Sequence, residues 1–239
     1  DVRDCLDEYL LYGGMPRITS FKDDISKKKY LSSLYDEVYI KDIIERHNIE
    51  KPYILEQILD YLSSQISSLT NPTNVANAIS DARKQKVDNN LVSSYINYSI
   101  DAFLVSVARR YDIKGKSYFK YPNKYYFTDL GLRNARLNFR QYDPGHLMEN
   151  AIYNELIRRG YSVDIGVVID RRKGNYALKE IDFVVNEGDR RIYIQSALRM
   201  DDAIKIESEL DSFRLTNDFF KKIIIRNDIN HSYYDDNGF

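Results

Sequence analysis

The sequence predicts an α+β protein in which a helical N-terminal segment and a three-helix module closed by a hairpin precede a small α/β domain. Three observations support this fold class. Apolar residues recur at helical spacing up to about Leu104. Two extended, basic runs follow, joined by a glycine. The remainder mixes strand-like runs with helical stretches, and 239 residues leave room for two small domains.

Composition excludes several classes of protein. Hydrophobic residues make up 43% and charged residues 30%, an ordinary balance for a globular domain. No apolar run approaches a membrane span, and the acidic start does not resemble a secretory signal. The single Cys5 cannot form an internal disulfide, and no Cys/His cluster has zinc spacing. We therefore expect a cytoplasmic protein with no membrane partner. Because the net charge is −1, nucleic-acid affinity would require a local basic patch.

Segments 1–50 and 51–140 both begin with helical patterns. In the first, Gly13 and Gly14 predict a turn. Its apolar positions recur at helical spacing and are Leu31, Leu34, Tyr35, Val38, Tyr39 and Ile43. Pro52 separates a second block, whose first helix carries an apolar stripe of Ile54, Leu55, Ile58, Leu59 and Leu62.

Two helix starts can be located in the second block. Asn71 is expected to cap a helix with Pro72 at its first position. We expect this helix to bury Val75, Ala78, Ile79 and Ala82. Asp88 is expected to cap a third helix that runs to about Leu104, with Leu91, Val92, Tyr95, Ile96 and Phe103 on its apolar side.

A hairpin is expected next, formed by LVSVARRYD and SYFKYPNKYYF. Gly115 offers the positive φ that a tight turn needs. Three helices followed by a basic hairpin is the order of a winged helix-turn-helix.

The third block, residues 141–239, predicts a small α/β domain. Its first helix carries Leu147, Ala151, Leu156 and Ile157 and ends at Gly160. Strand-like runs YSVDIGVVI, EIDFVV and RIYIQSA follow, then a helical stretch from Asp201 to Phe213 and the strand KKIIIR.

The third predicted helix of the second block has one polar face, formed by Asn90, Ser93, Ser94, Asn97 and Asp101. In a helix-turn-helix such a face lies in the major groove, so it is a candidate nucleic-acid-binding surface. The alternative is an ordinary solvated face. Without arginine or lysine, strong guanine readout is not expected, and Asp101 would repel phosphate.

The hairpin carries six cations against one acid, Asp112. The cations are candidate phosphate contacts and comprise Arg109, Arg110, Lys114, Lys116, Lys120 and Lys124. One interpretation is a wing that lies along the nucleic-acid backbone. The other is an edge hairpin, in which lysines face solvent and prevent aggregation.

A third constellation resembles a metal-dependent phosphodiesterase site that has lost its essential groups. Glu149 and Asp182 could hold Mg²⁺ weakly. The strand that should supply an acid and a lysine has Gln195 and Ala197 instead. Glutamine brings no charge and alanine brings no chemistry, so we expect no catalytic residue here. No other metal site is expected.

No G-x-x-x-x-G-K-[ST] loop is present, so this chain is not expected to bind ATP and needs no cofactor of its own. The three histidines, His47, His146 and His231, are scattered and suggest no catalytic set.

Several stretches, in order, resemble a family of bacterial and archaeal AAA-type ATPases that carry a C-terminal domain of unknown function. They are YLLYGGMPRI, VYIKDIIERHNI, NKYYFTDLGLRNARL, GHLMENAIYNELIRRGY, EIDFVV and RIYIQSA. The resemblance implies that a P-loop ATPase domain, which would bind ATP and Mg²⁺, precedes Asp1. It implies that residues 1–50 are a connector and that residues 141–239 form a degenerate PD-(D/E)xK, restriction-endonuclease-like domain.

Members of that family with an intact acid-x-Lys strand look like nucleases, and Gln195 and Ala197 depart from that pattern. We therefore expect a non-catalytic region that binds DNA weakly and non-specifically, next to its own ATPase domain and with room for a protein partner. Two alternatives remain, which are a metal-dependent nuclease and a regulatory or oligomerisation platform without DNA binding.

Overall fold

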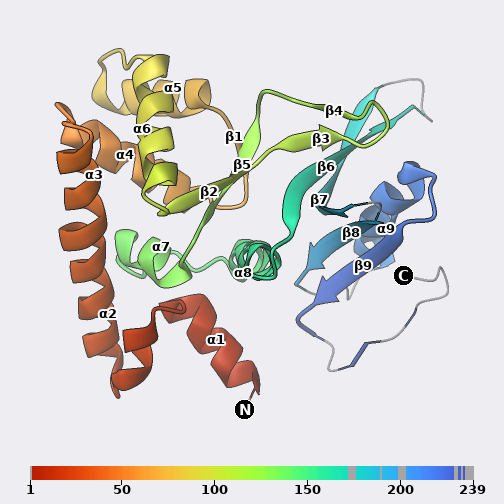
Figure 1. Cartoon of the computed structure of the whole chain (residues 1–239), viewed down its shortest axis with the longest axis horizontal. Helices are drawn as coiled ribbons and strands as arrows, with labels where there is room; N and C mark the ends of the chain where they lie inside the picture. Colours follow the sequence, from red (N-terminus) through yellow and green to blue (C-terminus); the bar gives the residue numbers. More distant parts are fainter. Residues whose placement is uncertain are drawn as a thin grey trace. The chain divides into compact units, whose positions relative to one another are not determined.

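The computed structural model describes residues 2–171, 176–188, 190–198, 203–228, 231–232 and 234 (Figure 1). The chain divides into two compact units. The first comprises residues 1–107 and 124–151, and the second comprises 108–123 and 152–239. The first is mainly helical and the second is built on a mixed six-stranded sheet, so the predicted α+β class is confirmed. No helix in the described ranges is long and apolar enough to cross a membrane.

The first unit begins with the predicted helical segment. It comprises α1 (Val2–Tyr12), a 3-10 turn (Pro16–Ser20), α2 (Asp24–Ser33), a π-helical stretch (Leu34–Ile40) and α3 (Lys41–Arg46). The last three form one continuous column (Figure 1). The predicted turn after α1 is confirmed, because Gly13 has a φ of 72°. The π-helical stretch was not predicted, since its residues follow ordinary helical spacing.

Helix α7 (Leu130–Arg136) joins this segment to the rest of the first unit. Asp129 caps α7 by accepting the Leu132 N–H, and it also accepts the Gly14 N–H at 2.8 Å. A Cβ atom on Gly13 would collide with the Asp129 carboxylate, so only glycine fits there. Asn134 donates to the carbonyls of Leu10 and Leu11 at the end of α1. The segments around residues 13 and 129, which belong to two of the stretches that resemble the ATPase family, therefore pack against each other.

The second block contains α4 (Pro52–Ser64), β1 (Leu69–Thr70), α5 (Pro72–Arg83), α6 (Asn89–Asp101), β2 (Val105–Ala108) and β5 (Asn123–Phe127). The strands pair in the order β1-β5-β2. Both predicted caps are confirmed. Asn71 accepts the Asn74 N–H at 2.8 Å, and Asp88 accepts the N–H groups of Asn90 and Leu91.

Two details of the helix predictions are wrong. The buried face of α5 is formed by Pro72, Val75, Ala76 and Ile79, whereas Ala78 and Ala82 are exposed. The buried face of α5 is thus rotated by part of a turn relative to the predicted face. Helix α6 ends at Asp101 because Phe103 takes a left-handed φ of 57° and directs the chain into β2. Phe103 is 78% exposed, rather than part of the apolar side.

The predicted hairpin forms, but it contributes to two sheets. Its base, β2 and β5, belongs to the three-stranded sheet. Its tip, β3 (Arg110–Asp112) and β4 (Ser117–Tyr118), belongs to the six-stranded sheet of the second unit. The positive φ at the turn falls on Lys116, not on Gly115. Gly115 instead leaves room for the Asp112 carboxylate, which accepts its N–H and would have to shift if a Cβ were present.

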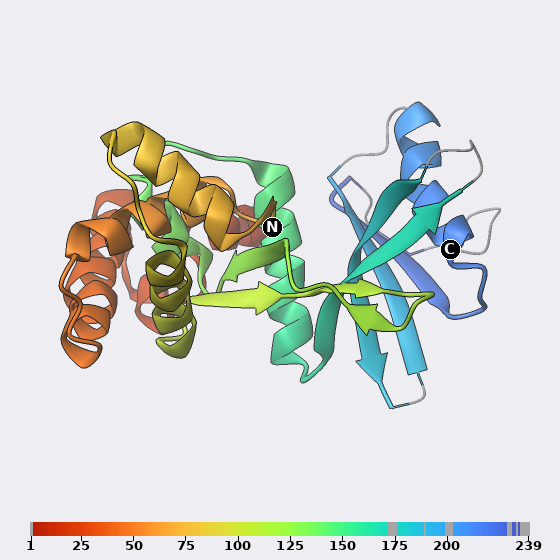
Figure 2. The same cartoon turned by 90° about the horizontal axis from the view of Figure 1, so that it is seen from above.

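The six-stranded sheet has the order β4-β3-β6-β7-β8-β9 (Figure 2). Strands β6 (Ser162–Asp170), β7 (Ala177–Glu187) and β8 (Arg190–Ala197) are antiparallel neighbours, while β3 runs parallel to β6 and β9 (Lys221–Arg226) parallel to β8. Helix α9 (Ala203–Thr216) packs on β6 and β7. The core of the unit is apolar and contains Tyr111, Ile113, Val168, Ile181, Val184, Tyr193 and Phe213.

The strand predictions for this block are confirmed, and KKIIIR corresponds to β9 residue for residue. Helix α8 (Pro144–Arg158) is followed by Gly160 in a left-handed conformation with a φ of 85°, as the sequence predicted. Leu147 and Leu156 are buried, while Ile157 is 43% exposed.

Candidate nucleic-acid interface

Helix α6 presents the polar face that the sequence predicted. Asn90, Asn97 and Asp101 are exposed, and Ser93 and Ser94 are half-buried. On the opposite side, Val92, Tyr95 and Ile96 are buried in the first core. The apolar side is therefore held by packing, which leaves the polar face available to a ligand.

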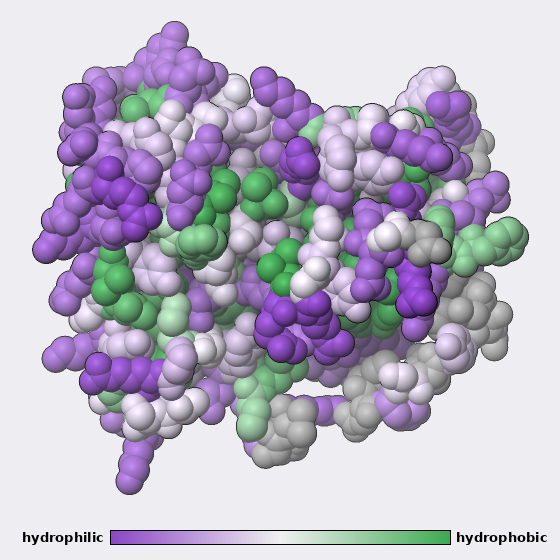
Figure 3. All heavy atoms as spheres, viewed as in Figure 1, coloured by the Kyte–Doolittle hydropathy of each residue, from purple (hydrophilic) through white to green (hydrophobic). Residues whose placement is uncertain are grey.

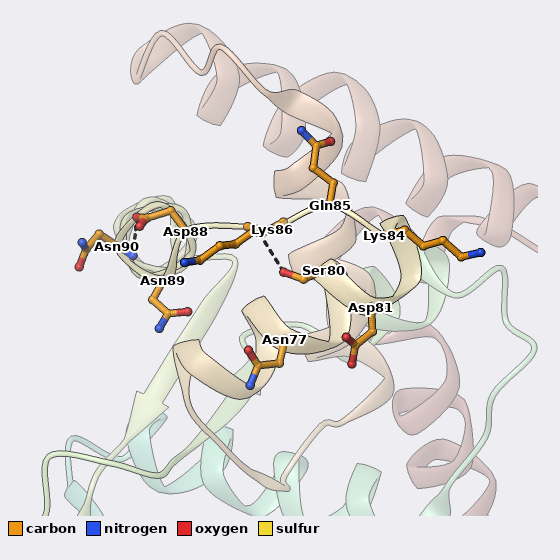
Figure 4. Close-up of a pocket in the computed structure, with 10 residues that line it drawn as sticks. Asn77, Ser80, Asp81, Lys84, Gln85, Lys86, Asp88, Asn89 and Asn90 are labelled. Atoms are coloured by element: carbon orange, nitrogen blue, oxygen red, sulfur yellow. Dashed lines mark hydrogen bonds between the residues drawn. The ribbon is translucent and has the colours of Figure 1, made fainter.

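The turn between α5 and α6 lines a solvent-open pocket of about 740 Å³ (Figure 4). The pocket is polar, and its lining residues are Asn77, Ser80, Asp81, Lys84, Gln85, Lys86, Val87, Asp88, Asn89 and Asn90. Ser80 fixes the turn, because its Oγ accepts the Val87 N–H at 2.9 Å and donates to the Ala76 carbonyl. Hydrophilic residues gather over this part of the surface (Figure 3).

Two of the six hairpin cations are buried in ion pairs. Lys124 Nζ lies 3.0 Å from Glu149 Oε1 within the first unit, and its side chain is only 7% exposed. Arg110 Nε lies 3.4 Å from Glu180 Oε1 within the second unit, and its guanidinium faces the Phe119 ring. In this conformation neither cation can reach a phosphate.

The other four cations, Arg109, Lys114, Lys116 and Lys120, are exposed. The Arg109 guanidinium covers the Tyr118 ring at 4.4 Å. The Tyr118 hydroxyl donates to Asp164 at 2.8 Å, which fixes the ring against β6. Burial raises the pKa of Asp164, while the Tyr118 hydroxyl and the Arg109 charge partly offset that rise. These four residues are the ones that could neutralise a nucleic-acid backbone.

Two residues of the second unit that the sequence analysis assigned to a degenerate nuclease site, Asp182 and Gln195, are linked by a hydrogen bond between β7 and β8. Gln195 Oε1 accepts the Asp182 N–H at 3.1 Å, and Asp182 Oδ2 accepts the Ser196 N–H at 2.8 Å. Regular pairing of β7 with β8 stops at Phe183 and Ile194. The two side chains thus continue the hydrogen bonding between these strands where the backbone ladder stops. Ala197, at the position where the sequence analysis compared the strand with an acid-x-Lys pattern, is buried.

Glu149 belongs to the first unit, where it is buried. Besides the Lys124 ammonium, it accepts the Tyr126 hydroxyl at 2.7 Å. In the part of the chain that the structure describes, no group of three or more His, Cys, Asp or Glu residues could hold a metal ion.

The sequence reasoning missed several residues of the pocket, namely Asn77, Lys84, Gln85, Lys86 and Asn89. Asn89 and Asn90 open the predicted helix α6, and Lys84 to Lys86 follow directly after α5. A signal was present, because this stretch is rich in carboxamide side chains. The periodicity of a single helix could not reveal it, since the pocket combines α5, the turn and α6.

Comparison with known proteins places the chain in a family. Residues 3–143 match the family described as Domain of unknown function (DUF8612), and the chain belongs to that family. Residues 144–238 match a second family, Domain of unknown function (DUF4143).

Two curated relatives cover most of this chain. An uncharacterized protein of Haemophilus influenzae is 32% identical over 218 residues, which is 91% of this chain and 51% of that protein. Uncharacterized protein MJ1544 of Methanocaldococcus jannaschii is 27% identical over 208 residues, which is 87% of this chain and 45% of that protein. The chain thus spans about half the length of these relatives. Among solved structures, none matches the chain significantly.

Proposed function

We propose that this chain is the non-catalytic, DNA-binding C-terminal part of an AAA-type ATPase, and that its residues 51–140 act as a winged-helix module. One observation carries the proposal. The elements follow the order α4, β1, α5, α6, β2 and β5, with β5 between β1 and β2 in the sheet. Under this proposal, helices α5 and α6 form the helix-turn-helix, and the residues between β2 and β5 form the wing.

The exposed polar face of α6 supports duplex binding. In helix-turn-helix proteins the second helix lies in the major groove and contacts base edges with its N-terminal residues. Here that helix is α6, whose first turn carries Asn89 and Asn90. The four exposed hairpin cations belong to the second unit and are a separate source of backbone contacts. Phosphate contacts of this kind fix position, whereas base contacts determine sequence preference.

The test of DNA binding is fluorescence anisotropy with a labelled duplex over a range of salt concentrations. If three or four cations contact phosphates, log affinity falls against log salt with a slope of roughly −3 to −4. We expect a dissociation constant on the order of 10⁻⁴ to 10⁻⁶ M near physiological salt. Replacing Lys114, Lys116 and Lys120 with alanine should weaken binding and flatten the slope.

A control with the same number of exposed lysines is available in the first unit, at Lys22, Lys29 and Lys41. Alanine at these three positions removes the same charge and should leave the salt slope steeper than the hairpin variant does. Equal effects of the two triple variants would mean that only net charge matters, and the wing assignment would fail.

The ATPase part of the proposal rests on the family resemblance and on relatives about twice as long as this chain. Because no phosphate-binding loop exists in residues 1–239, these residues should not bind ATP, whereas the longer protein should. Isothermal titration with MgATP tests both. Stoichiometric nucleotide binding to residues 1–239 would contradict the proposal.

Absence of catalysis is supported by the hydrogen bonds around Asp182, whose carboxylate binds the Ser196 N–H next to a neutral Gln195. We expect no cleavage of single- or double-stranded DNA with Mg²⁺ or Mn²⁺. Turnover that disappears in Asp182→Ala would instead establish the nuclease alternative.

A platform without DNA binding is the second candidate, and one observation favours it. The tip of the hairpin pairs with β6, so part of the wing is a structural strand of the second unit. Failure of the parent protein to bind any duplex at low salt would support this candidate.

A further inference from the structure

The pocket at the α5–α6 turn has a chemistry that the hairpin lacks. We infer that this pocket recognises the adenine edges of A·T-rich duplex DNA in the major groove. The inference rests on the proposed function and names the base pairs that the helix-turn-helix prefers. It concerns four carboxamide side chains, Asn77, Gln85, Asn89 and Asn90, which all line the pocket.

These carboxamides are available to a ligand. All four are exposed. Within the described residues, the side-chain amides of Asn77, Gln85 and Asn90 make no hydrogen bond. Asn89 makes one long contact, from Nδ2 to Thr73 Oγ1 at 3.4 Å. Asn77 and Asn89 extend into the same space between α5 and the start of α6 (Figure 4). Gln85 extends away from this space above the turn, and Asn90 projects from the far side of α6 (Figure 4). Asn77 and Asn89 are therefore the pair of carboxamides that the pocket brings toward each other.

Adenine is the base that matches such groups. Its major-groove edge presents the N7 acceptor beside the N6 donor, and asparagine or glutamine can bind both at once. Guanine presents two acceptors and favours arginine or lysine. Lys84 and Lys86 also line the pocket, but a phosphate site needs an excess of positive charge. Asp81 and Asp88 cancel it here.

The start of helix α6 does not act as an anion site. Asp88 already accepts the N–H groups of Asn90 and Leu91, so these two helix donors are satisfied. A neutral pocket with satisfied backbone groups fits an uncharged base edge better than a phosphate. The hydrogen bond between Ser80 and Val87 holds the turn in shape without using any carboxamide. The carboxamides are thus left for recognition rather than for folding.

The inference is tested by anisotropy with three duplexes of equal length. One has an A·T-rich core, one has a G·C-rich core, and one is the A·T-rich duplex with 7-deazaadenine, which lacks the N7 acceptor. We expect the A·T-rich duplex to bind tighter than the G·C-rich duplex by on the order of tenfold. The 7-deazaadenine duplex should fall toward the affinity of the G·C-rich duplex.

Two variants separate recognition from folding. The double variant Asn89→Ala with Asn90→Ala should erase the preference while keeping salt-dependent binding and an unchanged circular dichroism spectrum. Gln65→Ala, which removes an exposed carboxamide outside the pocket, should keep the preference. Equal affinity of the parent for all three duplexes, with the salt slope intact, overturns this inference but leaves the proposed function standing. Absence of binding to every duplex overturns both.

Discussion

The hairpin between residues 105 and 127 is one continuous segment, but its base and its tip differ in how deeply their strands are buried. At the base, every residue of β5 is buried, and Tyr125 and Phe127 belong to the first core. At the tip, both residues of β4 are exposed and the turn carries Lys114 and Lys116. Lys124 at the base is in a buried ion pair, as is Arg110 in β3, whereas the lysines of the turn are exposed.

Charged residues of one hairpin can therefore have different roles, either inside a core or at the surface. At the base, Lys124 is part of the interior because its ammonium donates to Glu149, which also accepts the Tyr126 hydroxyl. At the tip, Tyr111 and Ile113 enter the second core, and Arg110 beside them is buried in an ion pair with Glu180, whereas the turn lysines face water. One hairpin thus supplies strands to two sheets, and only its outward cations remain for a ligand.

The largest effect is expected from separating the tip from the second unit. A fragment of residues 144–239, where the second family match begins, lacks β3 and so loses Tyr111 and Ile113 from the core. Loss of a large buried side chain typically costs about 2–5 kcal/mol, and two such losses approach the whole stability of a small domain. We expect no cooperative urea transition by circular dichroism.

A fragment with the hairpin tip restored tests whether the missing tip causes that loss of stability. Joining residues 108–123 to 144–239 through a Gly/Ser linker should restore a cooperative transition, whereas the linker alone should not. If the bare fragment unfolds cooperatively with the stability of the parent, the tip is dispensable to the second sheet.

The next effect concerns the buried pair at the base. Glu149→Ala leaves the Lys124 ammonium buried without this partner, which typically costs about 3–5 kcal/mol. Replacing both, with Lys124→Met and Glu149→Leu, should recover most of the loss because the double variant buries no charge. Urea unfolding of the parent, Glu149→Ala, Lys124→Met and the double variant measures these differences in the free energy of unfolding. A double variant as unstable as Glu149→Ala would show that the hydrogen bond to Tyr126, rather than the charge, is decisive.

Local signals in the sequence predicted much of the fold. Asn71 and Asp88 were identified as caps because their side chains satisfy N–H groups within the next few residues. The strand KKIIIR was identified from its own composition. Such signals act over a few residues, and where the chain obeys them the prediction is confirmed.

Long-range contacts account for what could not be predicted. The parallel pairing of Arg110 with Ile165 joins segments far apart in sequence, and no periodicity records it. For the same reason the ion pairs that bury Arg110 and Lys124 were invisible, since Glu180 and Glu149 lie in other elements. The polar face of α6 could be predicted because it lies within one helix. The pocket could not, because it requires α5 and α6 to pack together.

A smaller effect is expected from the carboxyl group that holds the tip against β6. Burial raises the pKa of Asp164 above its ordinary value of 3.8, so the folded state binds this proton more tightly than the unfolded state. The resulting stabilisation is fully present below pH 3.8 and is lost as pH rises through the raised pKa. Relative to Asp164→Asn, the parent should therefore become less stable across that window.

Carbon-detected NMR titration checks the cause of this pH dependence. Tyr118→Phe removes the hydroxyl that lowers the pKa of Asp164, so that pKa should rise further. An unchanged or lower pKa in Tyr118→Phe would mean that the hydrogen bond does not control this carboxyl group.

The smallest effect on stability is expected at the cations of the tip, and it completes the comparison with the base. Lys114, Lys116 and Lys120 are exposed, and exposed charges contribute little to folding. The triple alanine variant should unfold within about 0.5 kcal/mol of the parent for each substitution, by urea titration. It should nevertheless lose DNA affinity equally on A·T-rich and G·C-rich duplexes, because phosphate contacts carry no sequence information. A strong loss of stability would place these lysines with Lys124 as structural cations. Unchanged binding with unchanged stability would make the tip a solvated edge, protected by its charges from aggregation.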